Sequence, residues 1–306
     1  MLKTLLYIIF ILSTSLSAAD SLDIRLNADF NGDNNKDIFL SKNNEFNILL
    51  MDGINTQYQG SPAFILEPEL SLKAAFALNS SAQAKADKAL QKALSLWSPR
   101  FITDLNNDHN DDIIFVHKNT QQISIQLMDG VSILDTNKPS FNLEPSLSQA
   151  ISDAPTESAK LKLEKNLAKA LSSWILTHVA DFNGDGNHDL LFTHKKTFRN
   201  RIQLMDGYQV LSGDEPLFEL ELDLRNSVAN ASDPKTLSKA QKTLDKALSY
   251  WRLRYVVDLN NDNNTDLIFV HTKSRAVSIQ FMDGLNVLSS QSDEFKLALE
   301  PEVFGI

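Results

Sequence analysis

The chain has 306 residues, of which 42% are hydrophobic and 22% are charged, and it contains no cysteine. The lack of cysteine excludes disulfide bridges and a lipid-anchored cysteine, and the net charge of −10 disfavours a general nucleic-acid-binding role. The length suits one large domain or an array of repeats.

The first 19 residues have the pattern of an export signal. Lys3 supplies a basic beginning, an apolar run follows, and small residues complete the segment. We predict a secretory signal peptide that is cleaved after Ala18 or Ala19, which would make the mature chain secreted, periplasmic or attached to the cell surface. An uncleaved anchor is the alternative, but the apolar run is short for a membrane span, and we expect no span in the mature chain.

A nine-residue segment with oxygen-bearing side chains at alternate positions occurs four times, at residues 29–37, 104–112, 181–189 and 258–266. Positions 1, 3, 5, 7 and 9 are Asp, Asn, Asp, Asn and Asp in every copy. The residues concerned are Asp29, Asn31, Asp33, Asn35, Asp37, Asp104, Asn106, Asp108, Asn110, Asp112, Asp181, Asn183, Asp185, Asn187, Asp189, Asp258, Asn260, Asp262, Asn264 and Asp266.

This spacing predicts a calcium site in each loop. Alternate side chains in a tight loop can turn toward one point, where three carboxylates would repel each other without a cation, and Ca²⁺ accepts six to eight oxygen ligands. Positions 4 and 6 hold only Gly, Asn or His, which best tolerate left-handed backbone geometry. We therefore expect about four Ca²⁺ per chain, whose charge of about +8 would leave a net charge of about −2. A set of ordinary polar turns is the alternative.

The EF-hand begins with a similar pattern but needs a glutamate at position 12 and a helix on each side. Position 12 is here Leu40, Phe115, Phe192 or Phe269, within strand-like runs. The pattern therefore predicts a calcium loop between strands.

The repeat is longer than the loop. Asp104, Asp181 and Asp258 are 77 residues apart, and a Met-Asp-Gly sequence recurs in phase with them. In the second copy we predict strands at 100–104, 112–117, 123–127 and 141–144, which would form a four-stranded antiparallel meander.

An amphipathic helix follows each of the first three meanders. Apolar residues recur at i, i+4, i+7, i+8 and i+11 up to Trp97, Trp174 and Trp251, and a shorter helix, as at 70–78, is expected before each. Asp233 and Pro234 predict the start of the third long helix. The alanine-rich stripe suggests a helix lying close against a sheet. The opposite face carries lysines, which suit a solvated face better than an anionic partner.

The tryptophans precede the strands that lead into the loops, and packing against the sheet is favoured over a sugar-stacking platform. His117, His194 and His271 are repeat-equivalent. Because they belong to different repeats, hydrogen bonding at strand ends is favoured over a joint metal site.

We therefore predict a mainly β fold with helical inserts, built from four antiparallel meanders with a calcium loop between strands. The expected division is a signal peptide at 1–19, followed by repeats at 20–97, 98–174, 175–251 and 252–306, the last without helices. The repeats together are expected to form one domain.

Residues 181–192, followed by the Ile-Gln-Leu-Met-Asp-Gly sequence that ends at Gly207, resemble the FG-GAP/VCBS-type repeat family. That family includes the calcium-binding blades of integrin α-subunit β-propellers. The resemblance extends to all four copies and implies calcium ligation by Asp181, Asn183, Asp185 and Asp189, with a backbone carbonyl from position 7. Family propellers commonly have about seven blades, whereas this chain has four units and helical inserts, so a closed ring and an open curved array both remain as alternatives.

The sequence shows no catalytic constellation, because it lacks a cysteine nucleophile, an H-E-x-x-H motif and a G-x-S-x-G motif. We expect a non-catalytic recognition or adhesion module whose partner is a glycan or a surface protein. The alternatives are a structural component of an envelope assembly and a glycan-acting hydrolase, since paired carboxylates can lie far apart in sequence.

Overall fold

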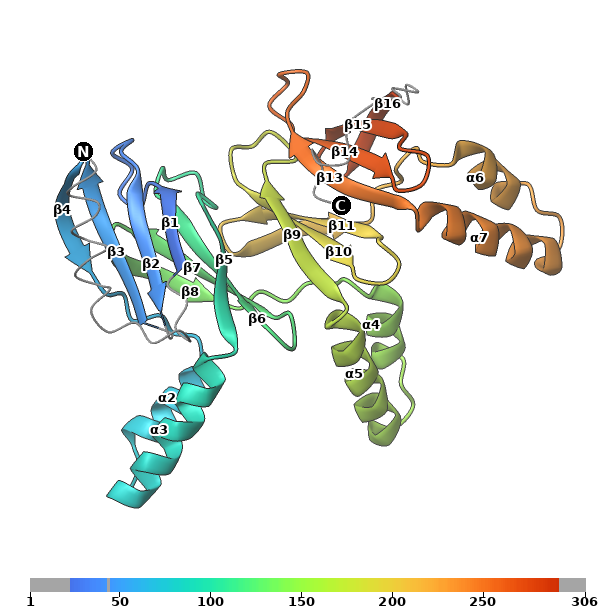
Figure 1. Ribbon diagram of the computed structural model, residues 1–306. Coiled ribbons are helices and arrows are strands. Elements are labelled where there is room, and N and C mark those ends of the chain that lie inside the picture. Colours follow the sequence, from blue (N-terminus) through green and yellow to red (C-terminus); the bar gives the residue numbers. More distant parts are fainter. Residues whose placement is uncertain (1–22, 43–44, 292–306) are drawn as a thin grey trace. The chain divides into compact units, whose positions relative to one another are not determined.

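The computed structural model describes residues 23–42 and 45–291. The predicted signal peptide lies outside the described residues. The chain divides into two compact units, Met1–Pro139 and Ser140–Ile306. Each unit contains two four-stranded antiparallel sheets, shown in Figure 1.

In every sheet the strands lie side by side in chain order, which confirms the four meanders. The strands of unit 1 are β1 (Asp23–Ala28), β2 (Asp37–Lys42), β3 (Glu45–Asp52), β4 (Asn55–Gly60), β5 (Trp97–Thr103), β6 (Asp112–His117), β7 (Ile123–Asp129) and β8 (Ser132–Asn137). Those of unit 2 are β9 (Trp174–Ala180), β10 (Asp189–His194), β11 (Asn200–Asp206), β12 (Gln209–Asp214), β13 (Trp251–Val257), β14 (Asp266–His271), β15 (Val277–Asp283) and β16 (Asn286–Gln291).

The prediction of a fourth strand at 141–144 was wrong, because the fourth strand of the second repeat is β8. Gly130 has a φ of +60° in the tight turn after β7, so the chain reverses at once and Asp129 pairs with Ser132. The later residues Phe141 and Leu143 are apolar because their side chains pack in the interior, and they do not pair with a strand of the sheet. Leu143 is 5% exposed, and the ring of Phe141 lies 5.0 Å from that of Phe192.

Each third strand shifts register against the fourth at the methionine of Met-Asp-Gly. In the second repeat, Leu127 pairs with Asp135 but Met128 pairs with Ile133, which leaves Leu134 as the extra residue of a β-bulge. The same shift occurs at Met51, Met205 and Met282. The repeat therefore places a bulge at the strand end that faces each loop.

A pair of helices follows each of the first three sheets, as predicted (Figure 1). The pairs are α2 (Pro68–Ala75) with α3 (Ser80–Leu94), α4 (Pro145–Ser152) with α5 (Glu157–Leu171), and α6 (Leu222–Ala229) with α7 (Pro234–Leu248). Asp233 caps α7 in a capping box with Thr236, which confirms the predicted start of this helix.

The alanine stripe suggested that the long helices lie close against the sheets, but α3 and α5 do not bury a face there. Each short helix contacts the long helix that follows it, and α3 and α5 contain no fully buried residue. Leu94 and Leu248, at the ends of α3 and α7, reach the cores of their units.

The two sheets of each unit share one apolar core. Phe30 and Phe39 from the first repeat meet Ile113 and Met128 from the second, and all four are fully buried. In unit 2 the equivalent core includes Phe182, Leu191, Leu267 and Met282. Within residues 23–42 and 45–291, no helix has the length and apolar character needed to cross a membrane.

Candidate metal centre

The aspartate at position 1 organises the backbone of each loop. In the third loop, Oδ1 of Asp181 accepts the N–H groups of Asn183 at 3.2 Å and Gly184 at 2.7 Å, and Oδ2 accepts that of Gly186 at 2.8 Å. Asp29, Asp104 and Asp258 accept backbone N–H groups of their own loops in the same way. This carboxylate holds the loop closed by local hydrogen bonds.

Positions 3 and 5 are joined through their side chains. Nδ2 of Asn183 donates to Oδ2 of Asp185 at 2.8 Å, and Oδ1 of Asp185 accepts the N–H of Asn187 at 2.8 Å. The other loops repeat both bonds. The backbone N–H two residues ahead lowers the pKa of Asp33 and Asp262, and this favours their ionised form.

The aspartate at position 9 has a different environment because it is fully buried in every loop. Oδ2 of Asp189 accepts the N–H of Phe182 at 2.9 Å, and Oδ1 accepts the N–H of Met205, which lies opposite the bulge, at 2.8 Å. Asp37, Asp112 and Asp266 make the equivalent pair of bonds. Position 9 therefore ties the loop to the Met-Asp-Gly turn, a structural role that the sequence interpretation did not assign.

Burial raises the pKa of Asp112 and Asp189 to about 7, although their two backbone donors lower it. The carboxylates at positions 1 and 5 of the same loop raise it further, so the three charges of a loop interact. The pKa of Asp37 and that of Asp266 are also raised by burial. A cation in the loop would relieve this accumulated negative charge.

The loops of one unit contact each other. In unit 1 the N–H of Asp111 donates to the carbonyl of Asp29 at 2.7 Å, and the N–H of Gly130 donates to the carbonyl of Phe30 at 2.6 Å. In unit 2, Thr265 and Gly284 make the same bonds to Asp181 and Phe182, at 2.8 and 2.7 Å. Each unit thus carries a pair of loops that are linked through their backbones.

Asp111 is an acidic residue of this region that the sequence interpretation missed. Its Oδ2 accepts the N–H of Asp29 from the neighbouring loop at 2.7 Å. Burial raises its pKa, and Asp29 and Asp104 raise it further, whereas Lys36 lowers it. The equivalent residue of unit 2 is Thr265, so the loop pair of unit 1 holds one more carboxylate than that of unit 2.

Two observations test whether a cation fits. Among the described residues, no group of three or more Asp, Glu or His side chains is arranged to hold a metal ion. The loop carboxylates accept backbone N–H groups instead. However, Oδ1 of Asn106, at position 3, is buried and has no hydrogen-bond partner, and the same is true of Oδ1 of Asn264, at position 7. Buried oxygens without donors are costly unless a cation or water meets them. The loops therefore offer the oxygen ligands that a hard cation such as Ca²⁺ prefers, while their carboxylates are turned toward the backbone.

Trp97 and Trp174 pack as predicted, and Trp251 is partly buried against the core of unit 2. Trp97 and Trp174 are 2% and 0% exposed, which leaves no face for a stacked sugar. Nε1 of Trp97 donates to Oε1 of Glu67 at 2.7 Å, and the pairs Trp174 with Glu144 and Trp251 with Glu221 repeat this bond. A histidine ring lies 5.1 Å from each of the three indoles.

The strand-end role of these histidines is also confirmed. Nδ1 of His117 lies 2.9 Å from the Thr120 hydroxyl, Nδ1 of His194 lies 2.9 Å from the Thr197 hydroxyl, and Nδ1 of His271 lies 2.8 Å from the Ser274 hydroxyl. Each ring therefore closes the turn that follows its own strand.

No protein-family model matches this chain, and a search of the curated proteins gives no match.

Proposed function

We propose that this chain is an exported calcium-binding repeat protein that acts as a non-catalytic recognition or adhesion module. The observation that carries the calcium proposal is the repeated loop, in which three interacting carboxylates accompany amide oxygens, one of which, Oδ1 of Asn106, is buried without a donor. A polar turn needs none of these features.

In each loop the carboxylates at positions 1 and 5 and the amide oxygen at position 3 would hold the ion. The buried carboxylate at position 9 would contribute as well, since each carboxylate oxygen has a second lone pair beside the one that accepts a backbone N–H. Bound calcium would supply a positive charge that removes the repulsion among the aspartates and fixes the loop. The loop pairing would then make each unit more rigid at the surface that carries the loops.

The test of this proposal is the stoichiometry of bound metal. Protein dialysed against calcium should contain about four Ca²⁺ per chain, with dissociation constants on the order of 10⁻⁴ to 10⁻³ M or somewhat tighter, as in extracellular modules. Magnesium should substitute poorly because it demands a smaller octahedral site. Metal analysis that finds one ion or none would contradict the proposal.

The recognition role rests on the repeat type and on the lack of a catalytic motif in the sequence. A glycan or a surface protein is the proposed partner, and the net charge of −10 disfavours nucleic acid. A calcium-dependent glycan array and sugar inhibition of cell binding test this role. A stable complex with envelope proteins would favour the structural alternative, and glycan hydrolysis would favour an enzyme.

A further inference from the structure

Strand β11 departs from the repeat pattern at two adjacent positions. Where the other repeats have Phe46, Ile123 and Val277, the third has Asn200. The next residue is Arg201, at the position of Asn47, Ser124 and Ser278. Asn200 and Arg201 are only 4% and 6% exposed, and an arginine is seldom buried to this extent without a full set of partners.

The first departure leaves space inside unit 2. In unit 1 the ring of Phe46 lies 5.2 Å from that of Phe64 and 5.3 Å from that of Phe115. Phe218 and Phe269 form the equivalent pair in unit 2, and their rings are 4.9 Å apart, as are those of Phe64 and Phe115. With Asn200 in place of the phenylalanine, a pocket of about 790 Å³ opens beside this pair.

The pocket has an apolar floor and a charged wall. Phe218, Leu244 and Phe269 are 7%, 5% and 2% exposed, whereas Leu217 at the rim is 80% exposed. The charged lining residues are Lys196, Arg199, Arg201, Arg225, Asp214, Glu215 and Asp245. Four cations and three carboxylates leave an excess of one positive charge, in a chain whose net charge is −10.

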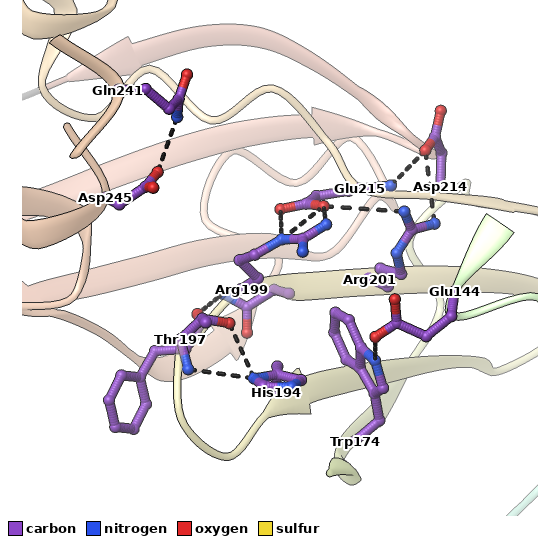
Figure 2. A network of polar contacts seen from close by, with 12 residues as sticks. Glu144, Trp174, His194, Thr197, Arg199, Arg201, Asp214, Glu215, Gln241 and Asp245 are labelled. Carbon is purple, nitrogen blue, oxygen red and sulfur yellow. Dashed lines mark hydrogen bonds and ion pairs between the residues drawn. The ribbon is translucent and has the colours of Figure 1, made fainter. Parts of the chain in front are cut away.

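Figure 2 shows Arg201 in this wall, with ion pairs to Asp214 and Glu215. These contacts leave hydrogen-bonding capacity of the guanidinium unused. Its Nη1 lies 3.8 Å from Oδ1 of Asp214 and its Nη2 lies 3.9 Å from Oε2 of Glu215, both beyond hydrogen-bond distance. Its Nε is buried and has no hydrogen-bond partner. Glu215 is already engaged by Arg199, whose Nε donates to its two oxygens at 2.8 and 3.0 Å. A guanidinium in this position can still donate hydrogen bonds to an anion.

We propose that this pocket binds an amphipathic organic anion, with the anionic group at Arg201 and the apolar body on the floor formed by Phe218, Leu244 and Phe269. The guanidinium selects the anionic group, because a carboxylate or phosphate would offer the acceptors that Arg201 lacks. The leucine and phenylalanine side chains favour an apolar body. The volume is in the range of small-molecule sites.

Isothermal titration calorimetry of the full chain with octanoate tests the proposal, with octyl phosphate as the second anion and octanol and octylamine as matched controls below their micellar concentrations. Octanoate or octyl phosphate should bind with one site per chain, and octanol and octylamine should bind about tenfold more weakly or not at all. Which anion binds more tightly identifies the preferred head group. Equal affinity for octanol or octylamine, or no binding of either anion, would overturn the proposal.

Two variants of the wall should change the affinity in opposite directions. Arg201→Ser introduces the residue of repeats 2 and 4 and should weaken anion binding about tenfold or more. Glu215→Gln removes the carboxylate that competes for Arg201 and should tighten binding severalfold. Lys239→Ser removes an exposed cation from α7 and should leave the affinity unchanged. An unchanged affinity in Arg201→Ser would overturn the assignment.

Asn200→Phe provides a test that changes no charge. It restores the aromatic residue of unit 1 at this position, so it should fill the pocket and abolish binding while the unit stays folded. If Arg201→Ser does not fold, retained binding in Asn200→Phe would overturn the proposal. The proposal does not rest on calcium binding, and the loop variant Asp185→Ala provides the check. The same titration of this variant should give the wild-type affinity.

Discussion

Gly184 of the third loop lies so close to Asn264 of the fourth that a β-carbon at position 184 would be 3.1 Å from Oδ1 of Asn264. Gly32 stands in the same relation to the second loop, where a β-carbon would be 3.1 Å from the carbonyl oxygen of His109. The two partner loops carry Asn107 and Asn261 at the equivalent position. Only the first loop of each pair therefore requires glycine for close approach.

Gly184→Ala should destabilise unit 2 by about 1 to 3 kcal/mol. The φ of +69° is unfavourable for alanine, and the new methyl group would press on Asn264. Gly53→Ala is the matched control, because Gly53 has a φ of +59° but no atom within 4 Å of its added β-carbon. Urea unfolding should show the larger loss for Gly184→Ala. Equal losses would mean that the contact between the loops does not matter.

Asp189→Asn should destabilise unit 2 even when calcium is absent. The substitution places an amide N–H₂ opposite one of two backbone donors, from Phe182 and Met205, and leaves that donor unsatisfied in the core. We expect a loss of about 2 to 4 kcal/mol in EDTA, measured by urea unfolding. Asp185→Asn, at an exposed position, should cost about 1 kcal/mol or less under the same conditions. Similar losses for the two variants would contradict the anchoring role of position 9.

The stability of unit 2 should depend on His178 below neutral pH. Burial lowers the pKa of this ring, and its Nδ1 is buried without a partner. In the unfolded chain the ring binds a proton near its ordinary pKa of about 6.5, whereas the folded unit resists protonation. The contribution of the neutral ring to the free energy of unfolding is therefore complete above that pH and falls as the pH decreases below it.

His178→Phe should remove this part of the pH dependence, because Phe101 occupies the equivalent place in the second repeat. The measurement is the difference in unfolding free energy between wild type and variant at pH 7.5 and pH 5.5. At the lower pH the unfolding free energy of the variant should rise relative to that of the wild type. Parallel curves would show that His178 does not titrate differently in the folded unit.

Much of the fold was predictable from the sequence because it is a matter of local pattern. The period of 77 residues, the alternation of residues 123–127 and the Asp-Pro start of α7 all predict elements that the structure contains. The fourth strand was misplaced because Phe141 and Leu143 are apolar, and apolarity alone does not distinguish a paired strand from a packed segment. The short exposed strand β8, with its polar side chains, gives a weaker signal.

The candidate sites were predictable only in part. The loops are visible as a repeated spacing, but the buried role of position 9 depends on the N–H of Met205, which a different strand brings to the loop. The pairing of the loops is visible in the sequence only at position 4, where Gly32 and Gly184 alternate with Asn107 and Asn261. The pocket is visible in the sequence only as the replacement of an apolar residue by Asn200 in one repeat of four. Its floor comes from segments that the sequence alone does not bring together.

The most direct test of calcium binding by the four loops is the melting temperature of the full chain in calcium and in EDTA, with Asp185→Ala beside the wild type. At a free calcium concentration ten times the dissociation constant, each loop should contribute about 1.4 kcal/mol, and the two loops of a unit should raise its melting temperature by roughly 6 to 11 °C. Asp185→Ala should lose about half of the gain in unit 2, and magnesium should reproduce little of it. Superimposable melting curves in calcium and EDTA, with Asp185→Ala melting like the wild type in both, would contradict the claim that the four loops bind calcium.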